Sequence, residues 1–158
     1  MTAHDGKKRL MMTELYVIGL DGSEAAGRAL DLAARQARAM NASLVLVHVI
    51  EWSRYAIMTP EDLAIRHQMR ETEIARARDH IMAPAAERLE KPGLPPLAHE
   101  DIIRHGAVAP VLCEVIEEKA ATQAFIGRTG HSKLAALMFG STANALAQAC
   151  PTPITLVP

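Results

Sequence analysis

Glycine and hydroxyl residues recur at a fixed spacing in the C-terminal part of the chain. Gly127 and Gly130 are followed, after nine further residues, by Gly140, Ser141 and Thr142. Glycine lets backbone amides approach an anion because it carries no Cβ. The second cluster is expected at the start of a helix, where unpaired amides and the helix dipole favour phosphate. The spacing therefore predicts a phosphate-binding loop, to which the two hydroxyls add hydrogen-bond donors.

Charged residues near this loop extend the prediction from a phosphate to a nucleotide. Arg128 and Lys133 can supply positive charge, and His131 directly follows Gly130 as a further candidate phosphate contact. Asp21 follows the first apolar run, where the tip of a strand is expected, and its carboxylate can accept a hydrogen bond from a ribose hydroxyl. In an open parallel sheet, ligands bind beyond the carboxyl ends of the strands. We therefore expect the sugar near Asp21 and the phosphates between the two glycine clusters.

A purely structural explanation of these residues stays open at this point. Gly127 and Gly130 can be ordinary turn residues, and Ser141 can be an ordinary helix N-cap. The long composite spacing is the observation that favours phosphate.

The remaining reactive residues are expected to have structural roles. His48 lies among valines and leucines and is expected to be a buried, hydrogen-bonded histidine rather than a catalytic one. Cys113 and Cys150 are expected to be small buried hydrophobic residues rather than redox centres, and two cysteines suit a reduced compartment. No H-x3-H pair or C-x2-C clamp occurs, so no metal site is expected.

A run of alternating charges lies in the middle of the chain. It is expected to form a solvated, salt-bridged helix face, and a partner-binding face is the alternative. Its members are Arg66, Arg70, Glu71, Glu73, Arg76, Arg78 and Asp79.

Short β-rich runs alternate with longer helical segments, which predicts a parallel sheet covered by helices. Ser23 is a candidate N-cap and Asn41 a candidate terminator of the first helix. Pro84 is expected to kink or split the long second helix, whose inward stripe is predicted to include His67. Strands are expected at residues 15–20, 42–50, 97–104, 123–126 and 153–157.

Length and composition exclude several classes of protein. The 158 residues suit one domain, with 49% hydrophobic residues and only 3% aromatic ones. The net charge of −1 and the few rings argue against a nucleic-acid partner. No apolar run is long enough to span a membrane, and residues 1–12 form a short basic leader without a secretion core. We expect a cytoplasmic protein with a flexible leader at 1–12 and one domain at 13–158.

Four segments, in this order, resemble the universal stress protein family. Asp21-Gly22-Ser23-Glu24 is similar to the family's first strand-to-helix turn, and Leu46-Val47-His48-Val49 to the end of its second strand. The spacing G-x2-G-x9-G-[ST] from Gly127 to Ser141 matches its nucleotide-binding pattern. Cys150 to Val157 is similar to its closing strand.

The resemblance implies a Rossmann-like α/β domain with a five-stranded parallel sheet of order 3-2-1-4-5 and helices on both faces. It implies a homodimer joined through strand 153–157, and bound ATP, with or without Mg²⁺, in members that carry the glycine pattern. Asp21 would meet the ribose, and the backbone of Val49 would hold adenine. The phosphates would be surrounded by Gly127, Gly130, Gly140, Ser141 and Thr142, with Leu20, Arg128 and His131 as neighbouring contacts.

Little or no turnover of the nucleotide is expected. The chain lacks the G-x4-G-K-[ST] loop of P-loop NTPases and a recognisable catalytic triad. Three hypotheses follow: an ATP-binding stress-response regulator or sensor with an unknown regulatory partner, a slow ATPase or phosphotransferase, and a dimeric interaction module that needs no nucleotide.

Overall fold

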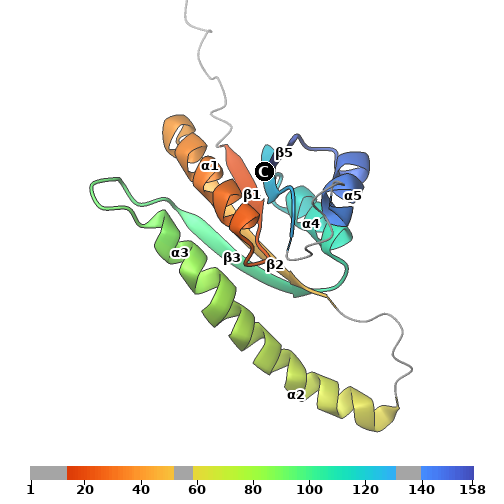
Figure 1. Ribbon diagram of the computed structural model, residues 1–158. Helices are drawn as coiled ribbons and strands as arrows, with labels where there is room; N and C mark the ends of the chain where they lie inside the picture. Colours follow the sequence, from red (N-terminus) through yellow and green to blue (C-terminus); the bar gives the residue numbers. More distant parts are fainter. Residues whose placement is uncertain (1–13, 52–58, 131–139) are drawn as a thin grey trace, which may run out of the picture.

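A computed structural model of the chain describes residues 14–51, 59–130 and 140–158, with only the helical backbone for residues 60–64. The five predicted strands are present, and their ends lie within two residues of the expected ones. The elements run β1 (Leu15–Gly19), α1 (Glu24–Met40), β2 (Ser43–Ile50), α2 (Pro60–Ala77), the π-helix η1 (Arg78–Met82), α3 (Ala83–Leu89), β3 (His99–His105), α4 (Val108–Glu118), β4 (Gln123–Gly127), α5 (Ser141–Ala149) and β5 (Ile154–Val157) (Figure 1).

The strands form one parallel sheet of order β3-β2-β1-β4-β5, as the sequence predicts. β1 is central, and Val17 is in register with Val45 of β2 on one side and Ala124 of β4 on the other. The chain builds outward from β1 to β3 and then crosses back to β4. The strand order therefore switches between β1 and β4, which is where such sheets bind ligands.

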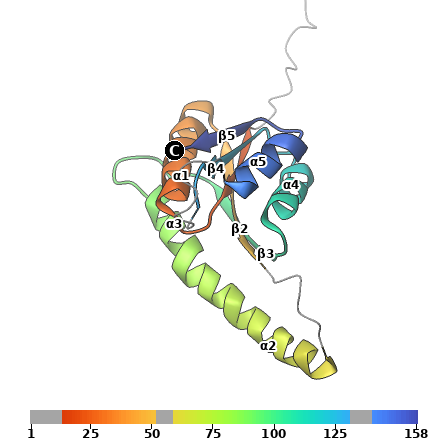
Figure 2. The same ribbon diagram turned by 45° about the vertical axis from the view of Figure 1, so that its right-hand side comes forward.

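Helices cover both faces of the sheet, so the fold has three layers. Figure 2 shows α4 and α5 together on one side and α1 with α3 on the other. The α1 face buries alanines of α1 together with Leu44, Leu46 and Met82, and the α4 face buries valines of β1 and β2 against Leu112 and Leu146. Both cores are almost entirely aliphatic, as the low aromatic content requires; Tyr16 and Phe125 form a tilted ring pair in the first core.

Local signals set the ends of α1 as predicted. The Ser23 hydroxyl accepts a hydrogen bond from the Ala26 amide at 3.2 Å, which satisfies one of the unpaired donors at the helix start. Asn41 adopts the left-handed conformation with φ 55° and ends the helix.

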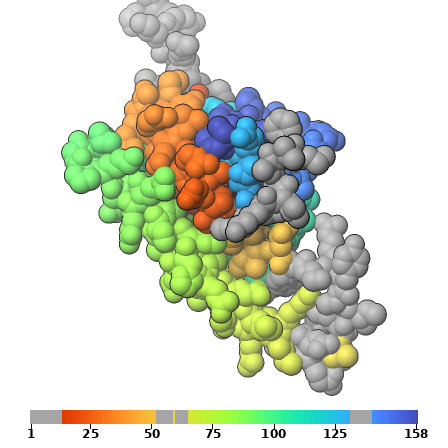
Figure 3. Space-filling model, viewed as in Figure 1, coloured from red at the N-terminus to blue at the C-terminus, as the bar shows by residue number. Residues whose placement is uncertain are grey.

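A long helical arm, formed by α2, η1 and α3, runs along the β3 side of the molecule and projects beyond the sheet (Figure 1). Figure 3 shows its green C-terminal half beside the orange surface of α1. The expected disruption at Pro84 takes the form of η1, because proline has no N–H to donate and a π turn accommodates this loss. The prediction that His67 faces inward is wrong: it is exposed, because none of the described elements covers this part of α2.

Candidate functional site

A cavity of about 720 Å³ opens at the carboxyl ends of β1, β2 and β4. Its wall is completed by the first turns of α4 and α5. Nine of the ten nucleotide-binding residues predicted from the sequence line this cavity: Leu20, Asp21, Val49, Gly127, Arg128, Gly130, Gly140, Ser141 and Thr142. The tenth, His131, and Lys133 lie outside the described residues.

The turn after β1 holds Asp21 in place against the second glycine of the pattern. Asp21 Oδ1 accepts a hydrogen bond from the Ser23 amide at 2.9 Å, and Gly22 adopts the left-handed region with φ 80°. A Cβ added to Gly130 would lie 2.9 Å from Asp21 Oδ2. Gly130 is therefore the residue that brings the β4 connection close to the carboxylate expected to meet the ribose.

Gly127 and Gly140 also permit close approach. A Cβ on Gly127 would lie 2.7 Å from the amide nitrogen of Ala26 and 2.8 Å from the carbonyl carbon of Ala25, so β4 packs directly on the start of α1. A Cβ on Gly140 would lie 3.2 Å from the carbonyl oxygen of Arg128. Among the described glycines, only Gly22, Gly93 and Gly106 have positive φ, so left-handed turns do not account for the glycine pattern.

The start of α5 presents backbone donors to the cavity. Gly140 is the N-cap, and Ser141 is the first helical residue, so the interpretation of Ser141 as an N-cap is wrong. No side chain within the described part of the chain caps this end. At this turn the Asn144 amide donates to the Gly140 carbonyl at 3.0 Å, the start of the intrahelical hydrogen bonds. The amides of the first turn and the positive end of the helix dipole therefore favour an anion here.

The backbone of Val49 lies beyond the end of β1 and faces the cavity. The Val47 carbonyl accepts from the Leu20 amide at 2.8 Å, whereas the Ile50 carbonyl accepts from the Gly106 amide on the β3 side. Because alternate residues of a parallel strand address opposite neighbours, the N–H and C=O of Val49 point to the β1 side, as those of Val47 do. The β1–β2 register ends at Gly19 and Val47, so no described strand pairs with this edge of Val49.

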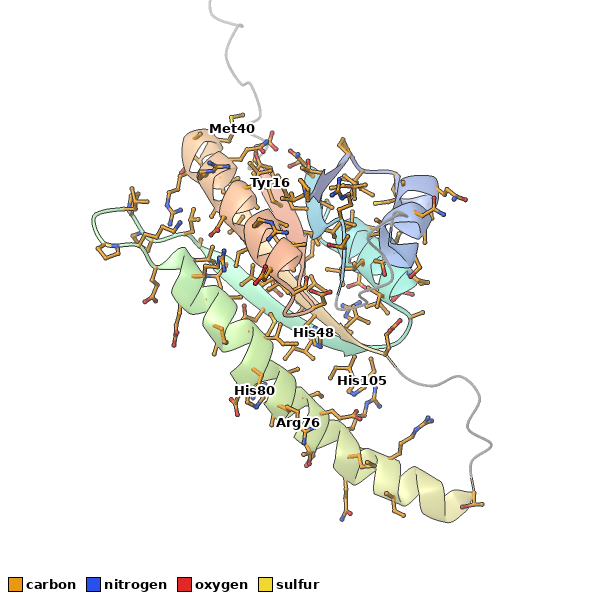
Figure 4. All side chains as sticks on the ribbon, in the orientation of Figure 1. Tyr16, Met40, His48, Arg76, His80 and His105 are labelled. Atoms are coloured by element: carbon orange, nitrogen blue, oxygen red, sulfur yellow. The ribbon has the colours of Figure 1, made fainter. Side chains whose placement is uncertain are left out.

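His48 stabilises the turn that follows β1 through a side-chain hydrogen bond. Its Nδ1 donates a hydrogen bond to the Leu20 carbonyl at 2.7 Å, which fixes the path of the chain just before Asp21. The predicted hydrogen-bonded histidine is confirmed, but it is half-buried rather than buried, and the residue is among those that line the cavity. Figure 4 shows His48 near the ends of β2 and β3, on the side of the sheet that faces the arm.

Several residues that line the cavity were not among the nucleotide-binding residues predicted from the sequence. The apolar part of the wall comes from Gly19, Val47, Val108, Leu112, Ile126 and Ala143, and Glu51 adds a carboxylate at the end of β2. Val108 and Leu112 lie on a helix with no motif of its own. The signal that could have found them is chain order: α4 follows β3 directly, so it begins at the same edge of the parallel sheet.

Two other kinds of feature, a metal site and a membrane span, are absent from the described residues. They contain no group of three or more histidine, cysteine or acidic side chains arranged to hold a metal ion. None of the described helices is long and apolar enough to cross a membrane.

The fold and the cavity define a class: a doubly wound α/β domain with a glycine-lined cavity where the strand order switches. Within that class, the model of the universal stress protein family matches residues 12–158, so the chain belongs to this family. Universal stress protein YxiE of Bacillus subtilis is 26% identical, over 92% of this chain and 99% of its own length.

Solved structures share the fold at lower identity. Universal stress protein UspA from Lactobacillus plantarum superposes with a TM-score of 0.76 at 20% identity, covering 92% of this chain and 97% of its own. A universal stress protein in complex with cAMP has a TM-score of 0.60 at 23% identity, covering 92% and 96%. The universal stress protein from Archaeoglobus fulgidus in complex with dAMP has a TM-score of 0.63 at 21% identity, covering 92% and 98%.

Proposed function

We propose that this chain is a stress-response regulator that binds an adenine nucleotide, ATP in the first instance, and turns it over little or not at all. The observation that carries the proposal is the convergence on one cavity of nine residues chosen from the sequence for nucleotide chemistry. The volume of about 720 Å³ lies in the range of small-molecule sites. The complexes of structural neighbours with cAMP and dAMP agree with an adenine nucleotide.

The outward edge of Val49 supports adenine as the base. An N–H donor beside a C=O acceptor matches the N1 acceptor and the N6 amine on the Watson–Crick edge of adenine. Guanine presents a donor and a carbonyl at the same positions, so both contacts would be mismatched. A site built to hydrogen-bond one pattern rejects the other strongly. We expect GTP to bind at least ~10-fold more weakly than ATP.

The phosphates are assigned to the start of α5. Ser141, Thr142 and Arg128 all line the cavity, so the first-turn amides, two hydroxyls and a guanidinium are available to the phosphates. Carboxylates of Asp21 and Glu51 also line it, and Mg²⁺ typically combines one or two carboxylates with phosphate oxygens. If Mg²⁺ accompanies the nucleotide, these two residues are the ones that would share it.

Calorimetric titration of ligand-stripped protein with ATP and GTP tests the site directly. Gly130→Val should weaken ATP binding at least ~10-fold, because its side chain would displace the loop from Asp21. Gln148→Ala, on the exposed side of the same α5, is the matched control and should bind ATP normally. Unchanged affinity in Gly130→Val would refute the placement, and equal affinity for GTP would refute the role of Val49.

Turnover is tested on the same preparation. Incubation with excess ATP should release less than one ADP per chain over the time of the titration. Multiple turnovers that disappear in Asp21→Ala would instead establish the slow ATPase.

A homodimer through β5 completes the proposal. β5 pairs with β4 on one side only among the described strands, and such an edge invites pairing with a second copy. The carbonyls of Pro153 and Val157 accept from the amides of Ala124 in β4 and of Arg128 just after it. Ile154 and Leu156 therefore direct their backbone groups to the open edge.

Leu156→Pro removes the backbone N–H that points to the open edge of β5. Leu156→Ala shortens the side chain and keeps that backbone donor. Light scattering should find Leu156→Pro monomeric and Leu156→Ala dimeric. A monomeric parent protein at micromolar concentration would contradict the dimer.

A further inference from the structure

The two cysteines of the chain are brought together by the fold. Cys113 lies in α4, and Cys150 follows the last residue of α5 as its C-cap. The Cys113 thiol lies near enough to Cys150 for the two side chains to interact. Both residues pack on the same aliphatic core beside Ile154 and Leu156, and both are half-buried rather than buried as the sequence analysis expected. Two half-buried thiols in contact form a pair that a small oxidant can reach.

We propose that Cys113 and Cys150 are a redox pair, closed to an intramolecular disulfide by exchange with a low-molecular-weight disulfide such as oxidised glutathione. Closure would bring the two neighbouring sulfurs to an S–S distance of about 2.05 Å. No other cysteine in the sequence competes for either thiol.

The environment of Cys113 sets the order of the two steps. Burial, and then the neighbouring Cys150, raise the pKa of the Cys113 thiol, so Cys113 is a poor initiating thiolate. The Cys150 thiolate attacks the small disulfide, forms a mixed disulfide and expels one thiolate, which takes up a proton. Cys113 then loses its proton, attacks the Cys150 sulfur and expels the second thiolate. In total, two protein thiols and one small disulfide give one protein disulfide and two small thiols.

The position of the pair connects it to the cavity, and this consequence rests on the proposed function. Cys113 is next to Leu112, which lines the apolar wall, and Cys150 ends the helix whose first turn carries Ser141 and Thr142. A covalent link between α4 and α5 therefore fixes two walls of the nucleotide cavity relative to each other. We expect the ATP dissociation constant of the oxidised protein to differ from that of the reduced protein by a few-fold.

Mass spectrometry of the full chain after treatment with oxidised glutathione tests the bond without reference to nucleotide. The parent protein should lose about 2 Da, the mass of two hydrogens, and both titratable thiols. Cys113→Ser should stop at a stable glutathione adduct on Cys150, whereas Cys150→Ser should be modified much more slowly. A parent protein that retains the adduct, or forms only intermolecular disulfides, would overturn the proposal.

The same reaction in urea controls for chance encounter of two thiols on one chain. The folded protein should close the disulfide at a ratio of oxidised to reduced glutathione at least ~10-fold lower than the unfolded chain requires. Equal ratios would mean that the fold does not bring the two thiols together, and this result would also overturn the proposal. Disulfide closure is measured by mass and does not depend on nucleotide. Failure to bind ATP would therefore refute the proposed function without affecting this test.

Discussion

The rim of the cavity and the helical arm are positioned by different means. At the rim, comprising residues 19–23, 127–130 and 140–142, backbone packs against backbone: the space for a Gly127 side chain is filled by Ala25 and Ala26. The arm, residues 60–89, is held by individual side chains. Met82 of η1 is fully buried in the first core, and the Arg38 guanidinium of α1 donates to the Leu89 carbonyl of α3 at 2.8 Å.

Polar pairs secure the arm at two further points. Arg88 forms a two-pronged contact with Asp31 of α1, at 3.0 and 2.7 Å, and packs over Gly27. His105 at the end of β3 lies 3.0 Å from a carboxylate oxygen of Glu73, towards the arm in Figure 4. Beyond these anchors α2 has little cover, and Ile65 and Met69 are more than half exposed. The rim is thus specified by the absence of side chains and the arm by their presence. A substitution that loosens the arm should therefore leave the geometry of the rim unchanged.

The largest expected effect is on the arm. Met82→Ala leaves a cavity where a fully buried side chain meets the first core, and should lower the free energy of unfolding by about 3 kcal/mol. Nucleotide affinity should be nearly unchanged, because Met82 does not line the cavity. Urea denaturation and calorimetric titration of one preparation measure both quantities. A parallel loss of affinity would show that arm and rim are coupled.

The corresponding change at the rim is Gly127→Ala. One methyl group would meet two backbone atoms at less than 3 Å, and neither can move without shifting α1. We expect a loss of about 2 kcal/mol in the free energy of unfolding, the usual range for an overpacked site. Here nucleotide affinity should fall as well, since β4 and α1 both border the cavity. Retained stability would mean that the rim yields more easily than its packing indicates.

The Asp31–Arg88 pair should give a smaller, pH-dependent effect. The Arg88 hydrogen bonds hold the pKa of Asp31 below its ordinary value of 3.8. The stabilisation is therefore present above that ordinary value and is lost as the pH falls through the lowered one. Both side chains are partly exposed, so Asp31→Asn should cost about 0.5–1 kcal/mol at pH 7. Urea midpoints of parent and variant should converge as the pH falls below the ordinary value of 3.8 and through the lowered pKa. A constant difference would assign the effect to packing.

The smallest effect belongs to the uncovered end of the arm. Met69→Gln replaces a side chain that is 55% exposed and should change the free energy of unfolding by less than about 0.5 kcal/mol. Val111→Gln, a substitution of comparable size at a buried position of α4, should be clearly destabilising. A large loss in Met69→Gln would show that α2 is covered in solution.

Local sequence determined a large part of this protein. The alternation of strand and helix patterns, the Ser23 cap and the Asn41 terminator follow from backbone preferences and burial within a few residues, and the structure confirms them. The sheet order was predicted from the resemblance to a family and is also confirmed. The glycine spacing located the rim because residues that follow parallel strands meet at one edge of the sheet. The binding roles of these residues stay predictions.

Tertiary packing alone decided the rest. That Gly127 makes room for α1, that Val108 and Leu112 form the apolar wall, and that Cys113 meets Cys150 are contacts between segments far apart in the chain. The exposure of His67 likewise depends on where the sheet ends beneath α2. Helical periodicity specifies which residues share a face, but only the assembled layers determine whether anything covers that face.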